Sequence, residues 1–485
     1  MDKKKLNNRV ANAAKWSVIT EIAAKLVTPI STMILARLLV PEAFGVVATV
    51  TMIVSFAEMF ADAGFQKYLI QHEFTDDNHR VASTNVAFWT NLIVAIFIWI
   101  IIIIFRERLA ILVGNPGLGI VIAIACVQLP ITAFSSIQMA LYRRDFDFKT
   151  LFLIRIIAIC IPFVVTMPLA FLGWGYWSLI IGTISGALLN AIILTLKSKW
   201  KPQLFFSFSL LKEMFSFSVW TLMEALSIWL IAWVDAFIIG SALNSYYLGL
   251  YKTSQTTVNG IMGIVTAATT PVLFAALSRL QNDESTFNMM YFKIQKLVAY
   301  AIFPMGTGIY LYSDVVTQIL LGSQWNEASA IIGIWGVTSA IVVVVSNFSS
   351  EVYRAKGRPR LSFISHLLHL VVLVPACIIS LNYGFGVLVL VRALVRLEGV
   401  VVGLIIMKYA IKFPIKNILS NISKPLLFTL LMCVAALGLQ QISSTFIWGL
   451  ISIVLCATAY FGMMWLFAKS DVKLIMNTFL KKNVG

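Results

Sequence analysis

The sequence predicts an all-α polytopic membrane protein with fourteen transmembrane helices. Of its 485 residues, 60% are hydrophobic and 12% are charged, and the mean hydropathy of +0.90 lies far above that of soluble globular chains. Apolar segments that reach the roughly 20 helical residues needed to cross a hydrocarbon core recur along the chain, without the two-residue alternation of barrel strands. The predicted spans are 14–39, 43–70, 83–105, 118–141, 150–172, 175–196, 213–240, 246–272, 294–312, 328–350, 361–381, 385–409, 422–441 and 445–468.

A proline separates the first two predicted spans. Pro41 can stop one helix and begin the next, with Glu42 in its first turn, so this stretch is predicted to be a transmembrane hairpin. Charged groups persist at membrane depth only where they face protein or water, so charges inside this hairpin indicate a cavity. The charged residues concerned are Glu21, Lys25, Glu58 and Asp62.

The basic residues predict the orientation in the membrane. An even number of spans places both termini on one side, and 28 of the 37 Lys and Arg residues lie in the termini and the loops of that side. The opposite loops hold two, Arg106 and Arg108. By the positive-inside rule both termini are expected to be cytoplasmic, and the net charge of +16 reflects topology rather than a nucleic-acid partner.

No catalytic apparatus is evident in the sequence. The predicted loops are too short for a folded soluble domain, and the chain has neither a GxxxxGK[ST] phosphate loop nor an HExxH zinc motif. All five cysteines fall within apolar segments and none forms a CxxC pair, which argues against disulfide or zinc chemistry. We therefore expect a protein that is not an enzyme and that uses no cofactor.

An internal repeat predicts the domain organisation. At an offset of 204 residues Trp16 matches Trp220, Leu39 matches Leu243, and Gly45 matches Gly249. Six spans per repeat give two parallel repeats related by an axis along the membrane normal. The predicted domains are an N-lobe at 1–200, a C-lobe at 201–415, and an accessory pair of spans with a cytoplasmic tail at 416–485.

Three segments carry a resemblance to a known family. The stretches LARLLVPEAFGVVA, FAEMFADAGFQKYLIQ and PVLFAALSRLQND resemble the polysaccharide exporters of the Wzx and teichuronic-acid type, within the multidrug/oligosaccharidyl-lipid/polysaccharide superfamily. The resemblance implies two six-helix lobes around a central cleft. It also implies a flippase that moves undecaprenyl-diphosphate-linked oligosaccharides to the outer face of the bacterial inner membrane by alternating access. Membrane lipids and polysaccharide polymerase machinery would be its further partners.

Two other functions remain open at the level of sequence. A cation-coupled multidrug exporter of the same superfamily would favour an acidic, aromatic cavity and a core of twelve spans. A non-transporting component of a polysaccharide synthase would leave charges inside the membrane without a purpose.

The cationic residues inside spans are candidates for substrate binding. Lys25 either pairs with Glu21 or Glu58, or lines the cleft and contacts the substrate diphosphate. In the lipid II flippases, which are related to this family, cationic residues on the first, second and eighth spans are thought to hold the diphosphate. Lys25 and Lys252 match that pattern by span only, and Lys252 could instead extend to the membrane surface.

Arg392 and Arg396 lie one helical turn apart near the middle of the twelfth predicted span. Like charges at this spacing repel, so an anion is expected to neutralise them. Glu398 does not share a helical face with both arginines. The alternatives are a carboxylate from another helix or a bound phosphate, which the planar guanidinium suits.

The acidic residues inside spans have two interpretations. They could titrate with proton transport or serve as ion-pair partners, and these residues are Glu58, Asp62, Glu224 and Asp235, with Glu21 in the hairpin. His366 and His369 are three residues apart, but a metal site would need further ligands that the sequence does not supply, so no metal is expected.

Overall fold

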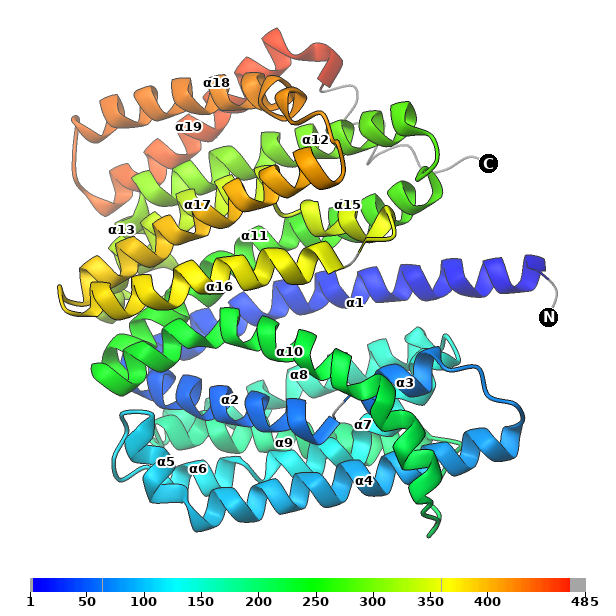
Figure 1. Cartoon of the computed structure of the whole chain (residues 1–485). Coiled ribbons are helices and arrows are strands. Elements are labelled where there is room, and N and C mark those ends of the chain that lie inside the picture. Colours follow the sequence, from blue (N-terminus) through cyan, green and yellow to red (C-terminus); the bar gives the residue numbers. More distant parts are fainter. Residues whose placement is uncertain (1–2, 63, 359, 472–485) are drawn as a thin grey trace. The chain divides into compact units, whose positions relative to one another are not determined.

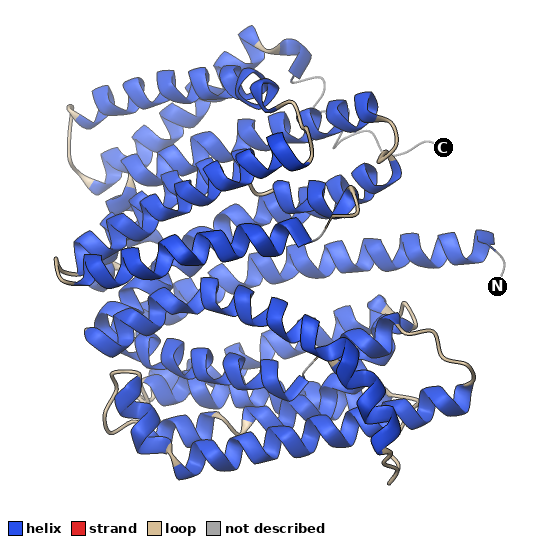
Figure 2. Ribbon diagram, viewed as in Figure 1, coloured by secondary structure: helices blue, strands red, loops and turns tan. Residues whose placement is uncertain are grey.

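A computed structural model describes residues 3–62, 64–358 and 360–471 of the chain. These residues form helices joined by short loops, and no strand occurs among them (Figure 2). The predicted all-α membrane fold is therefore confirmed. Within the described ranges, eleven helical segments are long and apolar enough to cross a membrane, so the predicted count of fourteen is not confirmed.

The three remaining predicted spans coincide with three further long helices. They are α1 (Lys3–Leu38), α12 (Glu284–Leu311) and α17 (Phe385–Ala410). Each exceeds the roughly 20 residues that a membrane-spanning helix needs. In α17 the apolar sequence is interrupted by four charged residues, and because of these charges α17 is not among the eleven apolar segments. The four residues are Arg392, Arg396, Glu398 and Lys408.

The chain divides into two compact units, Met1–Lys252 and Thr253–Gly485 (Figure 1). The predicted domain boundaries at residues 200 and 415 stay a prediction. Besides α1, the first unit contains α2 (Pro41–Asp62), α3 (Phe65–Gln71), α4 (Asp77–Ile104), α5 (Arg106–Leu112), α6 (Gly119–Ala125), α7 (Gln128–Arg144), α8 (Phe148–Phe171), α9 (Tyr176–Lys197), α10 (Phe208–Ala242) and the start of α11 (Ser245–Arg279). Besides the rest of α11, α12 and α17, the second contains α13 (Ser313–Leu320), a 3₁₀-helix (Ser323–Ala328), α14 (Ser329–Val345), α15 (Ser349–Ala355), α16 (Arg360–Leu381), α18 (Ile415–Gln440) and α19 (Phe446–Phe467).

The turn between α1 and α2 forms as predicted, with α2 beginning at Pro41. Beyond the turn the two helices have different neighbours. Helix α1 packs along α8, where the rings of Trp16 and Phe152 lie 5.1 Å apart, whereas α2 packs against α4, α7 and α10. Leu35 and Leu39 pack with Ala43 beside the turn, and farther along the main neighbour of α1 is α8.

Proline also explains the break between α6 and α7. Pro130 has no N–H to donate to the Cys126 carbonyl, which instead accepts a shorter-range bond from the Leu129 N–H (2.9 Å). The two helices still read as one segment, Gly119–Arg144, long enough to span a membrane. The predicted span 118–141 is therefore a broken helix.

Candidate functional site

Two arginines of α17 share one aromatic ring in the second unit. The guanidinium carbons of Arg392 and Arg396 lie 5.6 and 4.2 Å from the centre of the Trp335 ring on α14. Arg392 is 6% exposed and Trp335 is 3% exposed. The electron-rich face of an indole attracts cations, so this ring offsets part of the repulsion between the two arginines.

Hydroxyl groups of α14 complete the surroundings of Arg396. Its Nη1 donates to Ser339 Oγ (2.9 Å) and Thr338 Oγ1 (3.3 Å), and both of these residues are buried. Trp335 in turn donates its indole N–H to Asn259 Oδ1 of α11 (3.4 Å). We call Trp335, Thr338, Ser339, Arg392 and Arg396 the arginine–indole cluster. It presents two planar, permanently charged groups, which suits recognition of phosphate oxygens.

The nearby carboxylate Glu398 has a different partner. A hydrogen bond of 2.9 Å joins Glu398 Oε2 to His369 Nδ1 on α16. The expectation that Glu398 does not serve both arginines agrees with this geometry. His369 is thus engaged with a carboxylate, and no cluster of three or more His, Cys, Asp or Glu side chains suited to a metal ion occurs in the described part of the chain.

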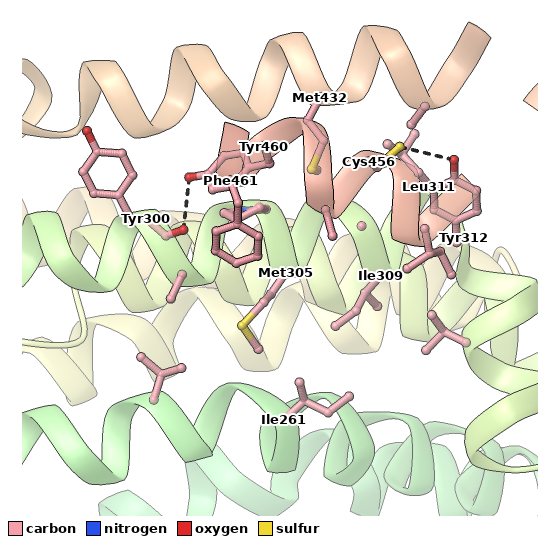
Figure 3. A pocket seen from close by; sticks show the side chains of 18 of the residues that line it. Ile261, Tyr300, Met305, Ile309, Leu311, Tyr312, Met432, Cys456, Tyr460 and Phe461 are labelled. Carbon is pink, nitrogen blue, oxygen red and sulfur yellow. Dashed lines mark hydrogen bonds between the residues drawn. The ribbon is translucent and has the colours of Figure 1, made fainter. Parts of the chain in front are cut away.

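A second feature of this unit is an apolar pocket of about 800 Å³. Side chains from α11, α12, α13, α18 and α19 line it, and Figure 3 shows Met305 and Ile309 of α12 and Phe461 of α19 among them. Polar groups of the lining residues form hydrogen bonds within the protein; the Tyr460 hydroxyl, for example, donates to the Tyr300 carbonyl (3.0 Å). The pocket can therefore hold an aliphatic chain but offers little to a charged group.

In the first unit the acidic residues of α2 have neutral partners. Thr132 of α7 donates to Glu58 Oε1 (2.9 Å), and Asp62 Oδ1 accepts from the Gln66 N–H (3.4 Å). Lys25 is partly buried on α1, and no ion pair between it and Glu58 occurs among the described residues. The side chains of Glu21 and Glu224 lie outside the described part of the structure. Their predicted pairing with other charges stays a prediction.

Asp235 and Lys252 tie α10 to α11. Asp235 is 1% exposed and accepts a hydrogen bond from the Tyr251 hydroxyl (2.6 Å). Lys252 donates to the Ala232 carbonyl (3.2 Å), and its ammonium lies 4.2 Å from the centre of the Trp233 ring. Lys252 therefore packs against α10, and Asp235 contributes to the same helix contact.

Sequence reasoning missed the neutral members of the arginine–indole cluster and the apolar pocket. Trp335, Thr338 and Ser339 fall in an ordinary apolar span, and nothing in their spacing links them to arginines more than fifty positions away. A tryptophan in the middle of a span, away from the interface that this residue prefers, is the one signal that could have pointed to a buried polar contact.

The fold and these features define a multi-pass helical membrane protein with buried cationic groups. The family model described as "Polysaccharide biosynthesis protein" matches residues 34–330, more than half of the chain, so the protein belongs to this family.

Similar proteins come from several bacteria. The succinoglycan biosynthesis transport protein ExoT of Rhizobium meliloti is 24% identical over 69% of this chain and 67% of its own length. The teichuronic acid biosynthesis protein TuaB of Bacillus subtilis is 23% identical over 90% of both chains. The lipopolysaccharide biosynthesis protein WzxC of Escherichia coli is 20% identical over 77% of this chain and 76% of its own length.

Two solved structures share the fold. The inward closed conformation of the lipid II flippase MurJ superposes with a TM-score of 0.72, at 16% identity, over 95% of this chain and 99% of that chain. An inward-facing multidrug resistance MATE family transporter of the MOP superfamily gives 0.62, at 15% identity, over 83% and 99%. The resemblance to polysaccharide exporters that the sequence motifs indicated is confirmed at the level of the polysaccharide-biosynthesis family.

Proposed function

We propose that the protein is a flippase that moves an oligosaccharide linked to undecaprenyl diphosphate from the cytoplasmic to the outer leaflet of a bacterial inner membrane. It is a transporter of polysaccharide biosynthesis and not an enzyme. The observation that carries the proposal is the arginine–indole cluster, because one buried and one partly buried guanidinium group on the same helix suit the oxygens of a diphosphate. The family supplies the context of polysaccharide biosynthesis.

The apolar pocket supports the lipid-linked nature of the substrate. A polyprenyl chain needs a dry surface, whereas its headgroup needs a wet, charged one. The second unit offers an apolar pocket between α12 and α19 and a cationic cluster between α14 and α17. We propose that the pocket holds part of the lipid chain while the cluster holds the diphosphate.

Alternating access of the two lobes around a central cleft is part of this proposal, as are cytoplasmic termini. An inside-negative potential favours outward movement of an anion by about 2.3 kcal/mol per charge per 100 mV, so the electrical field could supply part of the driving force. A multidrug exporter shares the fold, but the pair of arginines inside α17 favours an anionic cargo over a cationic one.

The decisive test is the identity of the lipid that the purified protein retains. The protein should be extracted from its own host in mild detergent and its bound lipids identified by mass spectrometry. We expect undecaprenyl diphosphate carrying an oligosaccharide, enriched in wild-type protein and reduced in Arg396→Ala. Wild-type protein that retains no polyprenyl lipid under conditions that keep phospholipids bound would contradict the proposal.

A further inference from the structure

A polar cavity of about 1110 Å³ lies in the first unit where α7 and α9 end. Residues of α4, α7, α8 and α9 line it, together with the loop before α8 and the segment that follows α9. Four cationic residues and two carboxylates line it, so its charge is net positive. These six residues are Arg80, Asp145, Asp147, Lys197, Lys199 and Lys201.

Some of these charged groups form ion pairs or hydrogen bonds with other residues of the protein. Arg80 pairs with Asp77 (3.2 Å), and Lys201 donates to the Thr195 carbonyl, which closes the end of α9. Asp147 begins α8 and accepts from the Thr150 N–H (3.2 Å). Lys197 and Lys199 are exposed and make no hydrogen bond or ion pair with another described residue. Two ammonium groups therefore remain available to an anion.

An apolar groove of about 430 Å³ lies between α7 and α9. Phe134 of α7 and Ile192 and Leu196 of α9 are among its walls. The two meet in the sequence of α9, since Leu196 lines the groove and Lys197 lines the cavity. An apolar groove and a cationic cavity therefore lie at successive residues of one helix, the two kinds of surface that the chain and the charged headgroup of a single lipid need.

Two buried donors mark the junction of groove and cavity. Thr195 lines the groove and Trp200 lines the cavity. The Thr195 hydroxyl and the Trp200 indole N–H have no hydrogen-bond partner in the described part of the chain. Both donor atoms are inaccessible from the groove and the cavity, so neither is assigned to a ligand.

The segment after the cavity exposes large apolar side chains. Leu204 is 93% exposed and Phe208 is 79% exposed. The Gln203 N–H donates to Asn85 Oδ1 of α4 (2.9 Å), which fixes this segment on the first unit. Apolar side chains beside lysines are typical of a segment at the membrane interface, where anionic headgroups gather.

We infer that the groove and cavity bind one anionic glycerophospholipid, with its phosphate between Lys197 and Lys199 and an acyl chain between α7 and α9. The ligand is a lipid phosphate, and bulk phospholipid is its source because the site opens beside an interfacial segment and leaves two ammonium groups for the headgroup. This site lies within the first unit and is separate from the arginine–indole cluster. It does not depend on the identity of the cargo.

The test measures lipid binding rather than transport. The full chain would be stripped of lipid in detergent and titrated with dioleoyl phosphatidylglycerol or dioleoyl phosphatidylcholine, with bound lipid counted by native mass spectrometry. Wild-type protein should bind the anionic lipid on the order of tenfold more tightly than the neutral one. The double variant Lys197→Ala/Lys199→Ala should lose this preference, because it removes the two available ammonium groups.

A matched control removes two exposed lysines that do not line the cavity, Lys149→Ala/Lys212→Ala, and should keep wild-type binding. Ile192→Trp should weaken binding of both lipids by filling the groove. If Ile192→Trp does not fold, the lysine variants alone test whether the site binds an anionic lipid. Equal binding of the two lipids by wild-type protein, or equal loss in the control, would overturn the inference. A site that takes undecaprenyl phosphate but not phosphatidylglycerol would overturn its assignment to bulk phospholipid.

Discussion

Gly45 on α2 and Gly249 on α11 make a reciprocal backbone contact inside the first unit. A Cβ atom added to Gly45 would overlap the carbonyl oxygen of Ser245, and one added to Gly249 would overlap the carbonyl oxygen of Pro41. Positions 41 and 245, like positions 45 and 249, are separated by the repeat offset of 204 residues. Each glycine therefore packs on the backbone carbonyl that lies four residues before the other glycine. Such a reciprocal contact is typical of two segments related by a two-fold axis.

This contact predicts that neither glycine tolerates a side chain. Gly45→Ala and Gly249→Ala should each force the two backbones apart, at a cost of about 1–3 kcal/mol or more, because the obstacle is a backbone carbonyl that cannot rotate away. Thermal unfolding in detergent and the yield of monodisperse protein would measure the loss. The two variants should behave alike.

Gly462→Ala on α19 is the matched control, since an added Cβ there meets nothing within 4 Å. It should unfold at the wild-type temperature or slightly above, because alanine favours a helix over glycine. Wild-type stability in Gly45→Ala would refute the close crossing of α2 and α11.

The second prediction concerns the indole between the two arginines. Replacing Trp335 with Leu removes the ring that offsets the repulsion of Arg392 and Arg396, and the protein should be destabilised. The same substitution should cost less when Arg396 is already Ala, by a coupling of about 0.5–2 kcal/mol. Chemical or thermal unfolding of the four proteins in this cycle gives the coupling directly, and additive effects would show that the ring and Arg396 are independent.

Transport should respond to the same arginine in a different way. Arg396→Ala should impair glycan export strongly and lower stability only modestly, whereas Arg396→Lys should restore export in part, since an ammonium keeps the charge but loses the planar fork. Lys408→Ala, at the exposed end of the same helix, is the control and should export normally. An unstable Arg396→Ala rescued by neutralising a carboxylate would assign the arginine to structure.

The third prediction concerns a variant whose new side chain fills part of the apolar pocket. Ala457 of α19 lines this pocket, so Ala457→Phe should occupy part of its volume and reduce export without lowering the thermal midpoint. Val454→Phe is the control, because Val454 is 60% exposed on the same helix and does not line the pocket. Full export by Ala457→Phe would separate the pocket from the transport pathway.

The fourth prediction concerns the start of α12. The Asp283 carboxylate caps this helix and accepts from the Thr286 N–H (3.1 Å), and this hydrogen bonding lowers the pKa of Asp283 below its ordinary value of 3.8. A lowered pKa in the folded state stabilises the protein above the ordinary pKa and is lost as the pH falls through the folded value. Asp283→Ala should therefore lower the thermal midpoint at neutral pH, and the difference from wild type should shrink on acidification. A difference that does not change with pH would contradict this.

The helical architecture and the turn at Pro41 could be predicted from the sequence, because apolar runs and proline determine the conformation of the residues next to them. The adjacent arginines could be predicted as well, because one helical turn brings them together. The contact of α1 with α8, the indole of Trp335 and the apolar pocket could not be foreseen, because each joins segments that are distant in the chain. A lone proline also changed one expected straight span into the broken pair α6 and α7.

The most direct test of the central claim is the sidedness of the lipid-linked oligosaccharide when the protein is depleted from its host. Spheroplasts and inverted vesicles would be treated with a membrane-impermeant reagent that labels the glycan, and the labelled fraction of the glycolipid compared before and after depletion. We predict that the glycolipid continues to be made and accumulates on the cytoplasmic leaflet, because the protein moves this molecule and does not synthesise it. An unchanged distribution between the leaflets, or the absence of the glycolipid, would contradict a flippase.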